Sequence, residues 1–328
     1  MQNKTILITG GTGSWGRELV GKLLEREPKE IRIFSRNESL QVEMRQEFQH
    51  HPKLNFIIGD IRDKYEVMQA CQQVDYIYHL AALKHVPICE QQPDSAMKTN
   101  VIGTQHVIQA AIANDVEKVI YVSTDKATHP SNTYGMTKAL AEKLIVHANL
   151  REGNTRFVCV RSGNVLGSTG SVVPLFKQRI AQGLDLSLTD SRMTRFFLTL
   201  EEAVALLLKA TEDSRGGEIY VTKMSACRIA DLTQVLIEEL ATGVVRINET
   251  GARPGESLTE SLISEFESTY SIDLDVRYYV ILPPYPIEGL QDYYAGSVPV
   301  DFRGYHSNHA LLSKPEIREM LLKGGLLA

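Results

Sequence analysis

Cysteine and tryptophan are scarce in this sequence of 328 residues, which contains four cysteines and one tryptophan. The cysteines Cys71, Cys89, Cys159 and Cys227 form no C-x-x-C pair, and each lies in an apolar or helical context. Disulfide frameworks and structural zinc sites both require patterned cysteines. A histidine spacing such as H-E-x-x-H is also missing. We therefore expect reduced thiols, no metal site and a cytoplasmic protein.

Long apolar runs and clusters of basic residues are missing as well. No stretch approaches the roughly 18 apolar residues of a membrane-spanning helix, and no charged-then-apolar leader precedes the first predicted strand. The net charge of -5 argues against nucleic acid as the main partner, because phosphate binding needs clustered Lys and Arg. We therefore expect no membrane or nucleic-acid partner.

The sequence does contain enough apolar residues for a large core, since 43% of its residues are hydrophobic. Strand-like runs alternate with helical periodicity over residues 1–166, and the alternation returns at about 194–223. This pattern predicts an α/β fold, with a Rossmann-type doubly wound parallel sheet. We assign residues 167–193 and 224–282 to a smaller C-terminal α/β substrate-binding lobe. Residues 283–328 are expected to form a tail whose only clear element is a helix over 315–322.

A glycine-rich loop follows the first predicted strand, Thr5–Ile8, and precedes a predicted helix over Arg17–Arg26. Glycines at three-residue spacing permit a tight turn and let the backbone approach a pyrophosphate at the helix N-terminus. The side chain of Trp15 is interpreted as packing. The loop residues expected to contact a dinucleotide are Gly10, Thr12, Gly13, Ser14, Trp15 and Gly16.

The second predicted strand, Ile31–Phe34, ends in Ser35-Arg36, where NAD-binding chains commonly have an acidic residue for the ribose. A hydroxyl and a guanidinium suit a 2'-phosphate, which favours NADP, although a solvated arginine is the alternative. Further strands are predicted over 54–58 and 74–79, and a long helix over 94–114. The other expected cofactor contacts are Asp60, Ile61, Ala81, Ala82, Lys84 and Asn100.

Four polar residues, Ser123-Thr124-Asp125-Lys126, follow the buried strand predicted over Val119–Val122. Ligands of open parallel sheets bind beyond the carboxyl ends of the strands, so this cluster is expected in a cleft. Tyr134 and Lys138 follow at i, i+4 spacing, which places both on one helix face. An ammonium beside a phenol favours the phenolate. A solvated turn and a surface ion pair are the alternatives.

Taken together, these motifs resemble the extended short-chain dehydrogenase/reductase family. The resemblance is strongest to the UDP-N-acetylglucosamine 4,6-dehydratases of bacterial surface-sugar biosynthesis, particularly the C5-inverting group of the pseudaminic acid route. It spans residues 3–283 roughly. The residues that carry it are Phe34-Ser35-Arg36, Leu83-Lys84-His85-Val86-Pro87, Ser123-Thr124-Asp125-Lys126-Ala127, Gly163-Asn164-Val165, Thr194-Arg195-Phe196 and Arg253-Pro254-Gly255-Glu256.

The resemblance implies catalytic roles for five residues. Tyr134, assisted by Lys138 and Thr124, would remove the C4 hydroxyl proton while hydride passes to NADP. The C4 ketone acidifies C5. Lys126, with a pKa lowered by burial and neighbouring cations, would take the C5 proton, and protonated Asp125 would give its proton to the departing C6 hydroxyl. Hydride then returns to C6.

Substrate contacts are also implied by the resemblance. UDP-N-acetylglucosamine would be held by Lys84, Asn164, Arg195, Arg253 and Glu256, with the two arginines on the diphosphate. Ser162 and Thr259 depart from the inverting group, which usually has Tyr and often His there, so C5 retention stays open. A 4-epimerase or 4-reductase and an NADP-sensing regulator are the other readings. The long helices over 94–114 and 134–152 suggest a homo-oligomer, at least a dimer.

Overall fold

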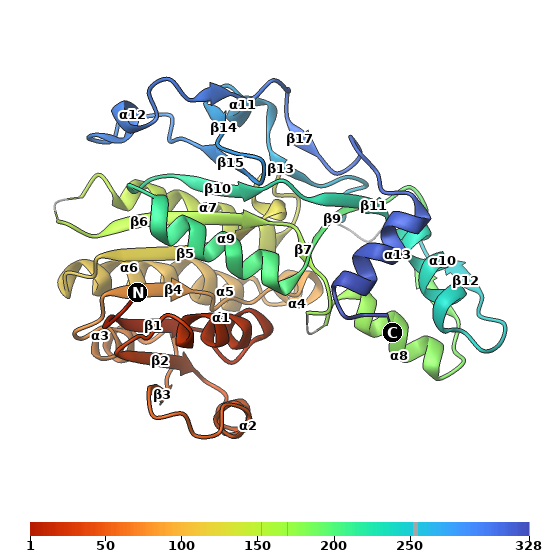
Figure 1. Ribbon diagram of the computed structural model, residues 1–328, viewed down its shortest axis with the longest axis horizontal. Coiled ribbons are helices and arrows are strands. Elements are labelled where there is room, and N and C mark those ends of the chain that lie inside the picture. The colour runs from red at the N-terminus through yellow and green to blue at the C-terminus, as the bar shows by residue number, and fades with distance from the viewer. Residues whose placement is uncertain (152, 169, 252–254, 328) are drawn as a thin grey trace.

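The computed structural model describes residues 1–151, 153–168, 170–251 and 255–327 (Figure 1). Within these residues the main sheet has ten strands in the order β16-β14-β15-β10-β6-β5-β4-β1-β2-β3. Its parallel part comprises β1 (Thr5–Thr9), β2 (Glu30–Ser35), β3 (Leu54–Ile58), β4 (Tyr76–His79), β5 (Lys118–Thr124), β6 (Arg156–Ser162) and β10 (Ile219–Thr222). The predicted α/β fold with a doubly wound parallel sheet is confirmed.

Helices cover both faces of this sheet (Figure 1). One face carries α1 (Ser14–Leu24) and α9 (Leu200–Asp213), which contact each other, and the other carries α3 (Lys64–Ala70), α6 (Gly103–Ala113) and α7 (Thr133–Ala148). The helix α2 (Glu38–Glu47) packs against β2 and β3. Apolar strand residues such as Ile6 and Ile8 on one side and Leu7 on the other belong to different core clusters, as the two-residue strand period requires.

The long helix expected over 94–114 is interrupted. The structure has α4 (Val86–Gln91), α5 (Pro93–Ala96) and a π-helical turn η1 (Met97–Ile102) before α6 begins. The π turn contains Asn100, whose buried side chain bonds both backbone groups of Leu83. Wider turns of this kind re-aim a side chain, and they occur mostly near functional sites.

The smaller lobe lies at one end of the sheet (Figure 1). Its helices and strands are α8 (Val172–Ala181), β7 (Asn164–Val165), β8 (Leu186–Leu188), β9 (Thr194–Leu198), β11 (Ser225–Arg228), α10 (Ile229–Leu240) and β12 (Ile247–Glu249). The strands β7 and β9, which were expected in the Rossmann part, instead pair with each other and with β11 in a separate three-stranded sheet. Residues 271–281, which the sequence analysis assigned to this lobe, instead form β14 (Ser271–Asp273) and β15 (Tyr278–Ile281) of the main sheet. They join it because β15 pairs antiparallel with the buried strand β10.

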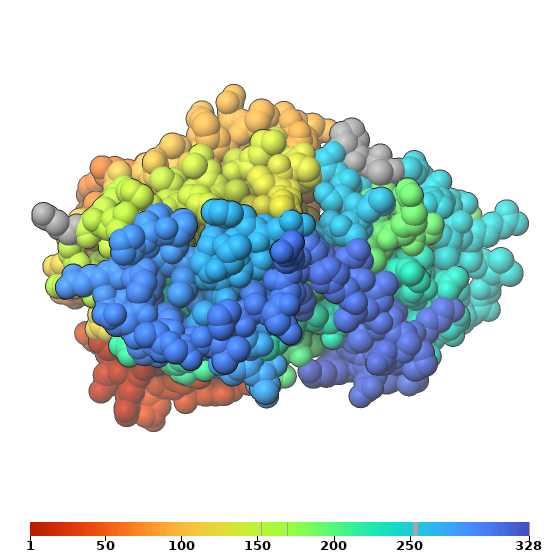
Figure 2. All heavy atoms as spheres, turned by 90° about the horizontal axis from the view of Figure 1, so that it is seen from above, coloured from red at the N-terminus to blue at the C-terminus, as the bar shows by residue number. Residues whose placement is uncertain are grey.

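The C-terminal segment, from β13 to the end of the described chain, packs across both parts of the molecule (Figure 2). Apart from β14 and β15, its elements are β13 (Ser261–Ile263), α11 (Glu265–Ser268), α12 (Leu290–Tyr293), β16 (Val298–Pro299), β17 (Tyr305–His306) and α13 (Lys314–Lys323). The strand β17 pairs with β13, and α13 packs on α10. The expected helix over 315–322 is therefore present, but residues 283–327 hold more structure than a tail with a single element.

A buried ionic cluster joins β6 to the segment that carries β13. The guanidinium of Arg161, 1% exposed, contacts the carboxylates of Glu142 at 2.6 Å and Glu267 at 2.9 Å. Arg161 Nη1 also donates to the carbonyl oxygen of Leu262 at 2.8 Å. The cluster thus fixes the backbone of β13 against the end of the parallel sheet.

Candidate active site

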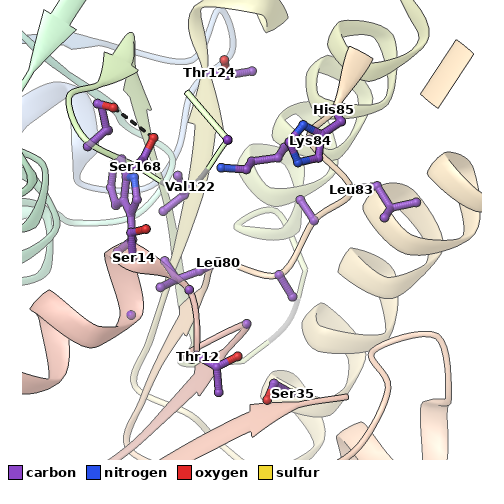
Figure 3. A pocket seen from close by; sticks show the side chains of 18 of the residues that line it. Thr12, Ser14, Ser35, Leu80, Leu83, Lys84, His85, Val122, Thr124 and Ser168 are labelled. Carbon is purple, nitrogen blue, oxygen red and sulfur yellow. Dashed lines mark hydrogen bonds between the residues drawn. The ribbon is translucent and has the colours of Figure 1, made fainter. Parts of the chain in front are cut away.

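A cavity of about 920 Å³ lies at the carboxyl ends of the parallel strands. Thr12 and Ser35 stand at one end of it and Thr124 at the other, while the Lys84 side chain points into the space between (Figure 3). The predicted residues that line this cavity are Gly10, Thr12, Gly13, Ser14, Trp15, Gly16, Ser35, Arg36, Asp60, Ile61, Ala81, Ala82, Lys84, Thr124, Asp125, Lys126, Tyr134, Lys138 and Asn164.

The glycine loop fits a dinucleotide pyrophosphate. Gly10 has a positive φ of 68°, and a Cβ there would lie 2.8 Å from the backbone of Ala81. A Cβ on Gly13 would meet only the Gly10 oxygen, at 3.5 Å, so this glycine leaves space on the ligand side. Gly13 is also the N-cap of α1, whose first turn has no acidic residue. Backbone N–H groups and the positive helix end therefore face the cavity.

The cavity is lined near Ser35 by Arg36 and Asp60, and a second arginine, Arg62, bonds Asp60. The guanidinium of Arg36, 52% exposed, lies 3.7 Å from Asp60, and Arg62 Nε donates to the same carboxylate at 2.8 Å. Burial acts to raise the pKa of Asp60, but its bonds to Arg62 outweigh this and lower it. Ser35 is buried and accepts from Gln41 at 3.0 Å. Asp60 is therefore ionised and paired with arginine.

Asn100 is not among the described residues that line the cavity, and its side chain instead bonds a loop that does line it. Its Oδ1 accepts from the Leu83 N–H at 2.8 Å, and its Nδ2 donates to the Leu83 carbonyl at 2.9 Å and to Thr137. The adjacent Lys84 reaches the cavity, and burial lowers the pKa of its ammonium. Asn100 thus positions the loop that presents Lys84. This role differs from the direct contact between Asn100 and the cofactor that the sequence predicted.

Thr124, Asp125 and Lys126 sit where β5 passes into the short 3-10 turn η2 (Asp125–Ala127). The Thr124 hydroxyl donates to Asp125 Oδ1 at 2.7 Å, and Lys126 Nζ lies 3.2 Å from the same oxygen. The second carboxyl oxygen of Asp125 is buried without a hydrogen-bond partner among the described residues. Burial and the nearby carboxylate of Glu260 raise the pKa of Asp125 to about 7. Asp125 can therefore carry a proton at neutral pH.

The expectation of a lowered pKa for Lys126 is wrong. Burial does act to lower it, but Asp125 and Glu260 outweigh burial and raise the pKa of the ammonium. The sequence analysis expected neighbouring cations, whereas Lys126 Nζ donates to Glu260 Oε1 at 2.8 Å. Lys126 is therefore a protonated ammonium in this structure.

Tyr134 and Lys138 share a face of α7, but Lys138 does not activate the phenol in the expected way. Its Nζ donates to the carbonyl of Val122 and lies 4.0 Å from the centre of the Tyr121 ring. Burial lowers the pKa of Lys138 to about 7. Burial also raises the pKa of Tyr134 to about 12, and the positive charge that opposes this shift is Lys126.

A second cavity of about 450 Å³ adjoins the first, and Asp125, Lys126 and Asn164 line both. Arg195 and Glu256, two of the predicted substrate contacts, line this second cavity. Arg253, a third predicted contact, lies outside the described residues. A basic side chain thus reaches a cavity that opens onto the Asp125-Lys126 pair, as an anionic substrate requires.

Glu260 is the central residue that sequence reasoning missed. It is 6% exposed, its carboxylate accepts from Lys126 at 2.8 Å and Asn164 Nδ2 at 3.0 Å, and it forms an ion pair with Arg195 Nε at 3.0 Å. Burial acts to raise its pKa, but Lys126 and Arg195 lower it to about 2. The only sequence signal was a second acidic residue four positions after Glu256, just before the apolar run of β13.

The chain is similar to proteins of known families. The family model described as "Polysaccharide biosynthesis protein" matches residues 6–282. A protein named UDP-N-acetylglucosamine 4,6-dehydratase (inverting) from Campylobacter jejuni is 45% identical over 284 residues, covering 85% of this chain and 83% of its own. A protein named UDP-glucose 4-epimerase from Rickettsia canadensis is 41% identical over 328 residues, covering 98% and 96%.

Among solved structures, Pen from Bacillus thuringiensis superposes with a TM-score of 0.92. It is 38% identical to this chain, and the match covers 98% of this chain and 99% of Pen. The similarity therefore includes the residues after 282, which the family model does not match. In the described part of the chain, no helix is both long and apolar enough to cross a membrane.

Proposed function

Because the chain belongs to the polysaccharide biosynthesis protein family, we propose that it is a lyase that converts UDP-N-acetylglucosamine to a 4-keto-6-deoxy sugar nucleotide with bound NADP. The observation that carries this proposal is the Asp125-Lys126-Glu260 cluster beside Thr124 and Tyr134. Its product would serve bacterial surface-sugar biosynthesis of the pseudaminic acid type.

The cluster favours dehydration over 4-epimerisation. Oxidation and reduction at C4 need only Thr124, Tyr134 and Lys138, and a 4-epimerase needs nothing else from the chain. Removing water across C5 and C6 also needs a base for the C5 proton and an acid for the leaving hydroxyl. Asp125 and Lys126 supply an acid and an amine at the same cavity wall. The Rickettsia relatives named as 4-epimerases make 4-epimerisation the second candidate.

The roles of the side chains follow from their positions. Tyr134 acts as the phenolate: its own proton first goes to solvent, which the positive charge of Lys126 favours, and the phenolate then takes the C4 hydroxyl proton with Thr124 on the same oxygen. Lys138 donates to the carbonyl of Val122. A bound nicotinamide cofactor would supply the acceptor for the C4 hydride and its return at C6. Asp125, whose raised pKa lets it carry a proton near neutral pH, gives that proton to the leaving hydroxyl. Lys126 exchanges the proton at C5.

The cofactor is proposed to be NADP because two arginines lie beside Asp60: Arg36, which lines the first cavity, and Arg62, which bonds the Asp60 carboxylate. Arg36 is half exposed and held only loosely by Asp60, so its guanidinium is available to a 2'-phosphate. Arg62 neutralises Asp60, which would otherwise repel that phosphate. The residues that would hold the rest of the cofactor are those of the glycine loop.

We further propose that the substrate diphosphate binds in the second cavity, near Arg195, with Glu256 on the ribose and Asn164 and Lys84 nearer the sugar. A twofold mate is proposed to pack on η1 and α7, where Met97, Met136 and Leu140 are exposed. Apolar side chains on adjoining helical segments suit a homodimer interface.

The test is incubation of UDP-N-acetylglucosamine with the enzyme in deuterated water, followed by mass spectrometry and NMR. The expected product has lost one water, has a C4 ketone and carries one deuterium at C5. Formation of the C4 epimer, with no loss of mass, would instead establish 4-epimerisation. Inversion at C5 is expected, and proton couplings at C5 and C6 check it. A xylo product at the earliest times would contradict inversion and leave dehydration in place.

A further inference from the structure

The carboxylate of Glu260 lies between the proposed C5 base and the proposed diphosphate site. Oε1 accepts from Lys126 Nζ on one side and forms an ion pair with Arg195 Nε on the other, and Oε2 accepts from Asn164. The side chain is 6% exposed, so its charge depends on these neighbours more than on water. A buried carboxylate shared by a lysine and an arginine is placed to pass a change at one to the other.

We propose that Glu260 controls the protonation of Lys126, by taking a proton from its ammonium when the substrate diphosphate shares the Arg195 guanidinium. This inference rests on the proposed dehydration. While Lys126 is paired with the carboxylates of Asp125 and Glu260, it is charged and cannot accept the C5 proton. The proton moves from Lys126 Nζ to Glu260 Oε1, across the existing hydrogen bond of 2.8 Å. A neutral amine and a neutral carboxylic acid remain.

The elimination then balances. The amine of Lys126 takes the C5 proton, and the C5–H electron pair becomes the C5=C6 double bond next to the C4 ketone. The C6–O bond breaks, and the hydroxyl leaves as water with the proton of Asp125. When Lys126 later gives a proton back to C5, it is neutral again, and the Glu260 proton can return to it. Asp125 regains its proton through solvent, and this proton is balanced by the one that Tyr134 took from the C4 hydroxyl and releases. No added oxidant is needed.

Arg195 is suited to be shared between Glu260 and an anion. Its Nη1 is held by the carbonyls of Thr194 at 2.8 Å and Leu258 at 3.3 Å, which anchor the side chain. Among the described residues, the hydrogen-bond partner of its Nη2 is the Met193 sulfur at 3.5 Å, a weak acceptor. An anion in the second cavity can therefore share this guanidinium. Sharing weakens the positive field on Glu260, which makes its carboxylate a better proton acceptor.

The other charged and titratable groups around the pair leave this logic unchanged. Asp125 precedes Lys126 on the same turn, and Tyr134 faces it from α7. The imidazoles of His129 and His306 line the second cavity, and His306 Nδ1 bonds the Ser261 hydroxyl at 2.6 Å. Burial and the neighbouring His309 and His129 lower the pKa of His306, so the His306 imidazole stays neutral near pH 7.

The C-terminal segment fixes the backbone of Glu260. The Glu260 N–H donates to Ser307 Oγ at 3.0 Å, and the Ser307 N–H donates to the Glu260 carbonyl at 2.9 Å. Ser307 is fully buried, and its hydroxyl also lies 2.7 Å from that of Thr194, at the start of β9 beside Arg195. One serine therefore ties together the strand that carries Arg195 and the residue that carries the carboxylate.

The test compares Glu260→Gln and Glu260→Asp with Glu265→Gln, a matched charge removal at an exposed position on α11. Reactivity of Lys126 toward acetic anhydride is followed against pH by peptide mass spectrometry, without substrate. In Glu260→Gln the pKa of Lys126 should fall by at least about one unit, because the carboxylate that raises it is gone. Glu260→Asp and Glu265→Gln should keep the wild-type value within about half a unit.

The second measurement is the pH dependence of C5 deuterium incorporation in a single turnover. The ascending limb should move to lower pH in Glu260→Gln and stay in place in Glu260→Asp, at a reduced rate. An equal loss of rate at all pH values, with unchanged Lys126 reactivity, would mean a merely structural role and overturn the inference. Absence of C5 exchange in the wild-type enzyme would instead reject the proposed dehydration.

Discussion

Replacing Arg161 with methionine should strongly destabilise the protein. The substitution removes a guanidinium that makes bonds of 2.6–3.2 Å to two carboxylates, and leaves Glu142 and Glu267 facing each other, 1% and 9% exposed. Breaking a buried ionic network by removing one partner costs about 3–5 kcal/mol. For a chain of this length, with an unfolding entropy of about 2.1 cal/mol/K per residue, that corresponds to a fall in Tm of roughly 4–7 °C.

The same cluster predicts the pH dependence of the loss. In the wild type, burial acts to raise the pKa of Glu267, but Arg161 outweighs it and lowers the pKa to about 2. This carboxylate therefore stabilises the fold above its unfolded pKa, 4.5, and the contribution is lost as pH falls toward 2. In Arg161→Met the uncompensated carboxyls have raised pKa values, so the variant gains stability as pH falls. The difference in the free energy of unfolding between the wild type and Arg161→Met should therefore become smaller from pH 7 to pH 4.

Urea unfolding followed by circular dichroism at several pH values measures both effects. The triple variant Arg161→Met, Glu142→Gln, Glu267→Gln is the control, because it removes the charges together and should recover most of the loss. A deficit below about 1 kcal/mol, or one of equal size at pH 7 and pH 4, would refute this account of the cluster.

Three further outcomes concern the cofactor and the reaction. Arg36→Ala should weaken NADP binding by roughly 10- to 100-fold, the worth of a charge-assisted phosphate contact, and NAD binding much less; equal weakening in calorimetry would remove the basis for NADP. Gly13→Ala should keep the wild-type Tm, since its Cβ has space in the protein, yet reduce cofactor affinity at least about tenfold in the same calorimetry. Tyr134→Phe should form no reduced cofactor in single-turnover absorbance, whereas Asp125→Asn and Lys126→Ala should form it and stall; its absence in the latter two would contradict the division of roles.

Most of the first cavity could be predicted from the sequence, because its residues follow strand ends. Parallel strands place their carboxyl ends at one edge, so Gly10, Ser35, Asp60 and Thr124 converge without any knowledge of side-chain packing. The strand predicted over Leu54–Ile58 has the same bounds in the structure, and the other predicted strands differ from β1, β2, β4 and β5 by one or two residues at one or both ends. Local pattern and sheet geometry suffice for this half of the site.

The charge state of the site could not be predicted in this way. Lys126 was expected to have a lowered pKa, and its neighbour Asp125, together with the carboxylate of Glu260 134 positions away in the chain, reverses that shift. Glu260 is brought there by the pairing of β13 with β17 and by the buried Arg161 contact to Leu262, neither of which leaves a periodic signal. The π turn at Asn100 was missed for a similar reason, since helical periodicity continues on both sides of it.

The tie made by Ser307 also sets the order in which the molecule can be completed during synthesis. Thr194 and Ser307 are 113 positions apart, and ribosomes add roughly 5–20 residues per second. The glycine loop and the parallel strands β1 to β6 therefore emerge on the order of ten seconds or more before the residue that locks Glu260 in place. Through that interval the residues of the glycine loop are already synthesised, while Lys126 still lacks its fixed carboxylate partner. The pairing of Lys126 with a fixed Glu260 therefore waits for the last part of the chain.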